Sequence, residues 1–87
     1  MNGQAALSLL GDGELRRVAT SARALLLLHA AREYGFVRGG PSIDVDRCED
    51  CLALAGERDV LPTGDEVDAA VAELIVGLNA EFARAAS

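Results

Sequence analysis

Residues 14–35 form the central segment of this chain, and four consecutive leucines lie in it at positions 25 to 28. In a helix, one face of the segment would carry apolar residues together with the only histidine: Leu15, Val18, Ala19, Ala22, Leu25, Leu26 and His29. A second apolar strip would follow another side of the same helix: Ala24, Leu27, Leu28 and Ala31. A helix that is apolar on two sides needs cover on both of them. The segment therefore predicts a central helix against which other helices pack.

Local signals mark both ends of this helix. Asp12 is suited to cap its start, because a short acidic side chain accepts hydrogen bonds from the first backbone N–H groups. Gly35 stands where a left-handed C-terminal cap is expected, and Phe36 is then placed to fold back on the last turn. The apolar run inside the helix, residues 24–31, is far shorter than the roughly 20 residues that a membrane span requires. We therefore expect no membrane partner.

Three further segments complete the predicted fold. Asp44 is expected to cap an acidic helix over residues 44–58, and Thr63 with Glu66 forms a capping-box pattern that opens a C-terminal helix over 64–85. The core face of that last helix would be a continuous apolar stripe: Val67, Val71, Leu74, Ile75, Leu78 and Phe82. Residues 1–13 are expected to form a short leading helix or an arm. The sequence thus predicts a single all-α domain over residues 1–87, a small three-helix bundle with a short additional N-terminal helix.

Charge is unevenly divided along the chain, whose formal net charge is −6. Residues 1–40 carry a net charge of +2, whereas residues 41–87 carry eleven acids against three arginines, a net charge of −8. Such an acidic surface repels nucleic-acid phosphates and suits a protein with a basic surface, so we expect a protein partner and no nucleic acid. Eight arginines and no lysine are typical of GC-rich bacterial coding. No basic segment leads into an apolar one near residue 1, and we expect a cytoplasmic location.

Cys48 and Cys51 are the only cysteines, and on a helix they lie three residues apart on one side. We expect both to be reduced thiols that act as small apolar core residues, with no cofactor. The alternative is a thiol- or metal-dependent regulator, in which His29 and Glu33 join the two thiolates around a metal. A redox pair needs its first thiol at a helix N-terminus, whereas Cys48 lies a turn inside, among acids that raise its pKa. No serine or threonine is positioned by sequence beside His29, so we predict no hydrolytic triad and no enzyme.

The start of the acidic helix carries a resemblance to a known family. Ser42-Ile43-Asp44, with Leu61-Pro62 further along the chain, resembles an acyl carrier protein. The Asp-Ser-Leu motif, at which that family attaches its prosthetic group, is missing here, so the resemblance does not predict such an attachment.

Helix-turn-helix DNA binding is a further alternative, because three helices of suitable size are predicted. The second and third of these helices begin with acids, however, which would face phosphate. DNA binding would therefore depend on a basic surface formed by Arg16, Arg17 and Arg23.

The main expectation is a protein-interaction role. Opposite its core face, the C-terminal helix carries a second stripe of mostly small residues: Ala69, Ala72, Val76, Ala80 and Ala83. On the central helix, Leu27 and Leu28 are the apolar residues expected to lack cover within a domain of this size. We therefore predict a non-catalytic cytoplasmic interaction or regulatory module, a homodimer or a small subunit of an assembly, with these seven residues as its interaction surface.

Overall fold

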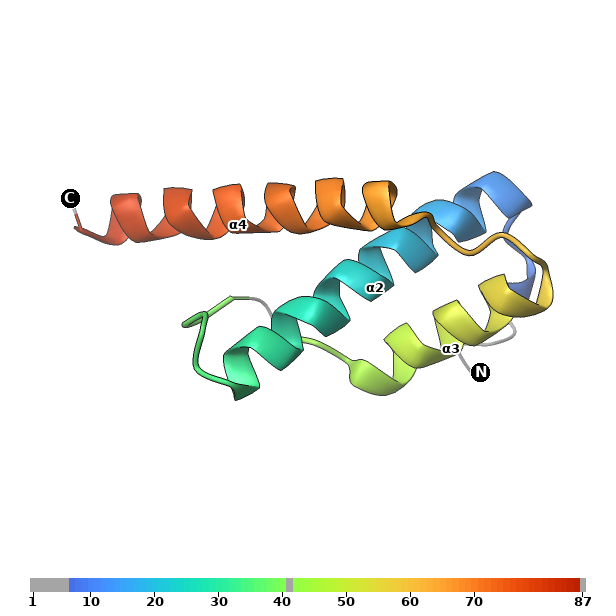
Figure 1. Ribbon diagram of the computed structural model, residues 1–87, viewed down its shortest axis with the longest axis horizontal. Coiled ribbons are helices and arrows are strands. Elements are labelled where there is room, and N and C mark those ends of the chain that lie inside the picture. Colours follow the sequence, from blue (N-terminus) through green and yellow to red (C-terminus); the bar gives the residue numbers. More distant parts are fainter. Residues whose placement is uncertain (1–6, 41, 87) are drawn as a thin grey trace.

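The computed structural model describes residues 7–40 and 42–86, without the side chains of residues 82, 85 and 86. These residues form helices joined by loops, with no strand among them. The predicted all-α class is confirmed. Helix α2 spans Asp12–Glu33, α3 spans Val45–Glu57 and α4 spans Gly64–Ala86. α2 crosses the middle of the molecule and both other helices pack against it (Figure 1). α3 runs antiparallel to α2, whereas α4 runs in the same general direction as α2.

Helix α2 is covered on two sides, as its two apolar strips predict. On the α3 side, Leu15 and Ala19 are fully buried in one cluster with Ala55 of α3. On the α4 side, Ala24 and Leu28 are buried where α4 passes. Most of the buried α2 residues are alanines, whose small side chains let neighbouring helix axes approach closely.

The ends of α2 differ in part from the prediction. The helix begins two residues earlier than expected, so Gly11 is the N-cap residue and Asp12 lies inside the first turn. Asp12 therefore does not cap the helix, and its Oδ1 lies 3.7 Å from Nη1 of Arg58 instead. At the other end Gly35 has φ +81° and donates its N–H to the Arg32 carbonyl at 3.1 Å. This is the left-handed cap that the sequence predicts.

The predicted caps of α3 and α4 are confirmed. Asp44 accepts a hydrogen bond from the Arg47 N–H at 3.1 Å. Thr63 and Glu66 form the reciprocal capping box, with the Glu66 N–H donating to Thr63 Oγ1 at 3.3 Å and the Thr63 N–H donating to Glu66 Oε1 at 3.4 Å. Both helices consequently begin at the next residue after their caps.

A short segment before α2 is tied to the end of α3. The Arg58 guanidinium donates to the carbonyl oxygens of Leu10 and Ser8, each at 2.6 Å. Leu7 is buried in a cluster with the two cysteines, and both Leu7 and Ser8 have helical backbone geometry. The leading helix or arm expected over 1–13 also covers residues 1–6, which lie outside the described residues.

The core stripe predicted for α4 is only partly covered. Val67 and Leu78 are buried, whereas Ile75 is 43% exposed, and the side chain of Phe82 lies outside the described part. The C-terminal part of α4 also extends past the helices that it packs on (Figure 1). The loop after α2 returns to α4 at Gly40, whose φ of +106° favours glycine and whose Cα faces Leu28 and Leu78. None of the described helices is long and apolar enough to cross a membrane.

Candidate interaction surface

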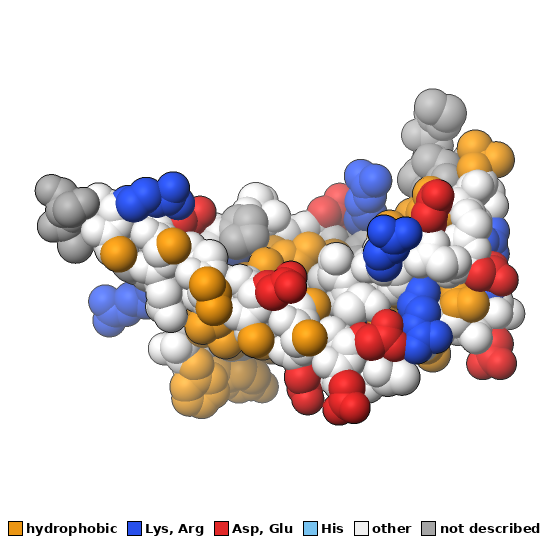
Figure 2. Space-filling model, turned by 90° about the horizontal axis from the view of Figure 1, so that it is seen from above, with side chains coloured by type: hydrophobic (Ala, Val, Ile, Leu, Met, Phe, Trp, Pro, Cys, Tyr) orange, Lys and Arg blue, Asp and Glu red, His pale blue; other side chains and the backbone are white. Residues whose placement is uncertain are grey.

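The outward side of α4 carries the stripe predicted from the sequence. Val76 is 67% exposed near the middle of this helix, and the four alanines of the stripe are exposed with it: Ala69, Ala72, Ala80 and Ala83. Figure 2 looks down on α4 and shows apolar side chains following it, with acidic side chains beside them. We call these five residues the α4 stripe. Its small side chains would allow the backbone of a partner helix to approach closely.

On α2 the structure separates the two leucines that the sequence grouped together. Leu27 is 45% exposed, as expected of an interaction residue. Leu28 is only 5% exposed, so its assignment to the interaction surface is corrected. The physical reason is that α4 and the returning loop both reach it, because Leu28 lies with Gly40 and Leu78 around the same cavity of about 350 Å³. The fold therefore supplies the cover that the sequence left open.

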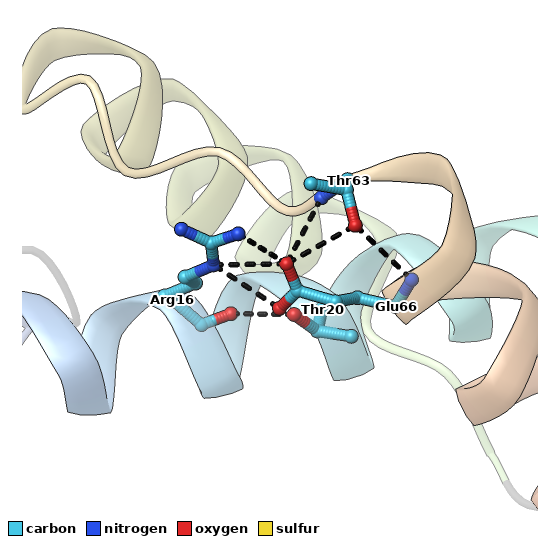
Figure 3. Close-up of polar contacts among 4 residues, drawn as sticks. All are labelled: Arg16, Thr20, Thr63 and Glu66. Carbon is cyan, nitrogen blue, oxygen red and sulfur yellow. Dashed lines mark hydrogen bonds and ion pairs between the residues drawn. The ribbon is translucent and has the colours of Figure 1, made fainter.

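A polar cluster joins the start of α4 to α2 (Figure 3). The Arg16 guanidinium pairs with the Glu66 carboxylate, with Nε 3.1 Å from each carboxylate oxygen. This hydrogen bond, together with those from Thr63, lowers the pKa of Glu66 from its ordinary 4.5 to about 2. Arg16 is thus engaged within the chain, and it is one of the three arginines that DNA binding would require.

The two cysteines are free thiols buried between α3 and α2. Cys48 and Cys51 pack in one cluster with Ala22 of α2 and Leu7. Burial raises the pKa of both thiols, and their mutual repulsion raises that of Cys48 further, against a smaller opposite effect of Arg47. A thiol is activated by the opposite shift, because the thiolate is the reactive form. Neither thiol therefore has the lowered pKa of an activated cysteine.

The four residues of the alternative metal site are not brought together. No group of three or more histidine, cysteine or acidic side chains suited to a metal ion exists in the described part of the chain. The cysteines lie against α2 around Val18, Ala22 and Leu25. His29, which is half-buried, and Glu33, which is exposed, come later along the same helix. The structure therefore does not bring His29, Glu33, Cys48 and Cys51 together in the way that the alternative metal site requires.

The end of α2 displays two aromatic rings that the sequence did not identify as a surface. Tyr34 is 78% exposed and Phe36 is 83% exposed, and their ring centroids are 6.4 Å apart. The Phe36 N–H donates to the Ala31 carbonyl at 2.8 Å, which completes a Schellman motif. The backbone of Phe36 therefore folds back as predicted, but its side chain does not pack on the last turn. We call Tyr34 and Phe36 the aromatic tip.

Helix α3 ends in the same motif with a different outcome. Asp59 takes the left-handed conformation with φ +57°, and the Val60 N–H donates to the Ala55 carbonyl at 2.9 Å. Val60 is half-buried against the cluster that contains Ala55. The residue after the left-handed position is thus packed at the end of α3, where it is Val60. At the end of α2 it is Phe36, and its side chain is exposed.

A cavity of about 400 Å³ lies where α2, the end of α3 and the start of α4 meet. Its lining is largely apolar, with one basic and one acidic side chain: Leu52, Leu61, Pro62, Val67, Arg23 and Asp68, beside Thr63 and Gly64. Leu61 is 52% exposed at this place. We call this the α4 cavity, and its size is within the range of ligand-sized pockets.

Comparison of the chain with models of known protein families, with curated proteins and with solved structures found no match to any of them.

Proposed function

We propose that this protein is a non-catalytic interaction module that associates with itself as a homodimer through the α4 stripe. The observation that carries the proposal is the exposure of Val76, 67% of whose surface faces solvent in the middle of a stripe of exposed alanines. Helix propensity explains the alanines, but it does not explain a β-branched valine on the surface. Contiguous exposed apolar surface on a small domain marks an interface.

A second copy is the simplest partner for this surface. Twofold dimers are the commonest small oligomers, and a twofold axis near Val76 would pack the stripe of one α4 against that of the other. Small residues at the contact permit interaxial distances at the close end of the ~8–10 Å range of packed helices. The acidic side chains beside the stripe would stay at the rim in contact with water.

A cytoplasmic setting and the finer details of the fold belong to the same proposal. We take the chain to be one domain, a three-helix bundle whose residues before α2 add a short helix. The helical geometry and burial of Leu7 support that helix. If the partner is another protein, the net charge of −8 over residues 41–87 favours one with a basic surface.

Light scattering on the wild type and on Val76→Glu tests the proposal. The mass of the wild type should rise above that of the monomer as the concentration increases, and Val76→Glu should lower the mass at each concentration, because it places a charge in the contact. Leu9→Glu is the matched control, since Leu9 is 86% exposed and lies outside α4. A wild type that stays monomeric at every concentration rejects self-association and leaves a different protein as the partner.

A further inference from the structure

We propose that the aromatic tip of one chain docks into the α4 cavity of a second copy. This inference deepens the proposed function, on which it rests in taking a second copy as the partner. The two contacts use different residues, however, so that each can fail without the other.

The aromatic tip has the features of a preorganised binding group. The chain contains only three aromatic residues, and two of them stand exposed at this one position. The Schellman hydrogen bonds fix the backbone that carries both rings, while the equivalent residue of α3, Val60, is packed on its own helix. A backbone that is already fixed loses little conformational entropy on binding, so that only the side-chain rotamers of the two rings remain to be ordered, and aromatic residues are frequent anchors of interfaces.

The α4 cavity offers a complementary receptor. Its apolar walls at Leu52, Leu61 and Val67 suit an aromatic ring, and its volume of about 400 Å³ is large enough to take one. The ring would cover Leu61, which is 52% exposed in the single chain. Arg23 lines the same cavity and can contact a ring face through a cation–π interaction.

The charges around the two surfaces are also complementary. Close to the tip in sequence, Arg32 and Arg38 outnumber the exposed Glu33, in the half of the chain with net charge +2. Asp68 lines the cavity and Asp65 lies in the first turn of α4, in the half with net charge −8. Opposite charges beside an apolar contact guide the approach of two molecules and set their orientation.

The two surfaces of one chain cannot meet each other. Arg23 of the cavity lies on α2, and Tyr34 of the tip is the C-cap residue of the same helix, eleven residues later, which separates the two by about 16 Å at 1.5 Å per residue. The Schellman motif holds the tip at the end of that helix. The contact must therefore join different copies, head to tail, and such a contact leaves an unused tip and an unused cavity at the two ends.

A titration between two complementary variants tests this contact, with both proteins carrying Val76→Glu so that the α4 stripe is disabled. One protein adds Leu61→Glu and keeps its tip, and the other adds Phe36→Ala and keeps its cavity. Titration calorimetry should detect a 1:1 complex of the two, although each alone stays monomeric. Asp68→Arg is a second cavity variant in case Leu61→Glu fails to fold, as judged by its circular dichroism.

The outcomes separate the inference from the proposed function. Removing Phe36 from the tip-bearing protein as well should abolish binding, whereas Leu9→Glu in its place should leave binding unchanged. Absence of a complex between folded variants overturns the inference, even if the Val76→Glu variant has a lower mass in solution than the wild type. Binding that persists without Phe36 also overturns it, because the tip is then not the docking group. A complex found although Val76→Glu leaves the wild-type mass unchanged supports the tip contact and rejects the α4 stripe.

Discussion

Arg16 and Glu66 join α2 to α4 across 50 residues of sequence, and the carboxylate that receives the Arg16 guanidinium also closes the capping box of Thr63. One side chain thus both starts α4 and fixes its first turn against α2 (Figure 3). Because the α4 stripe and the α4 cavity both depend on where this helix begins, the pair positions both proposed contact surfaces.

The first prediction concerns the pH dependence of stability. Arg16 and Thr63 hold the pKa of Glu66 at about 2, below its ordinary 4.5. Between these values the unfolded chain binds the proton that the folded chain refuses, so this contribution to stability is fully present above pH 4.5 and is lost as the pH falls towards 2. Urea unfolding from pH 2 to 7 measures it. Glu66→Gln should flatten this part of the profile, and an unchanged slope in that variant contradicts the assigned pKa.

The second prediction compares adjacent leucines of α2. Leu28→Ala should reduce the free energy of unfolding by about 2–4 kcal/mol, because it leaves a cavity against α4. Leu27→Ala should cost well under half of that, since Leu27 is 45% exposed in the single chain. Chemical denaturation below the concentration of self-association measures both. Equal losses would show that α4 does not cover Leu28 as the structure has it.

The third prediction concerns the thiols. Burial raises the pKa of Cys48 and Cys51, so a thiol reagent at neutral pH should modify the folded protein slowly and the unfolded protein quickly. The purified protein should contain no stoichiometric zinc, and a chelator should leave its unfolding midpoint unchanged. Zinc at one equivalent in elemental analysis, lost in Cys51→Ser, would contradict a structural role for the pair.

The fourth prediction is that the protein does not bind duplex DNA at physiological salt. The net charge of −8 over residues 41–87 opposes the phosphates, and Glu66 already neutralises Arg16. A gel-shift titration checks this. A shift that weakens steeply with added salt and disappears in the variant Arg16→Glu with Arg17→Glu would overturn it.

Local sequence signals predict where the helices begin and end. They do not predict which residues of different helices pack against each other. Asp44, the capping box at Thr63 and the left-handed Gly35 each act within a few residues, so the sequence carries them directly. The prediction that Asp12 caps α2 is wrong by one position, because the N-cap is Gly11 and no side chain there marks the start of the helix.

Contacts between distant segments were not predictable in the same way. The burial of Leu28 depends on the path of the loop through Gly40 and on the length of α4 beside α2. The display of Phe36 depends on what lies next to the end of α2, because the same motif in α3 leaves Val60 packed. A single sequence shows the motif but not the neighbour, which is why the aromatic tip and its cavity emerged only from the structure.

The location of the contact between copies is tested most directly by a distance measurement near Val76. Asn79 is exposed one turn after Val76 and lies outside the α4 stripe, so Asn79→Cys can carry a spin label without replacing a contact residue. The buried Cys48 and Cys51 should react slowly with the label. Pulsed dipolar spectroscopy is then recorded at a concentration where light scattering finds dimers. If the twofold axis of the dimer lies near Val76 and the two α4 helices pack antiparallel about 8–10 Å apart, the labels should show a single short distance. Val76→Glu should abolish that distance. Dimers without a short distance, or a distance that persists in Val76→Glu, would contradict self-association through α4.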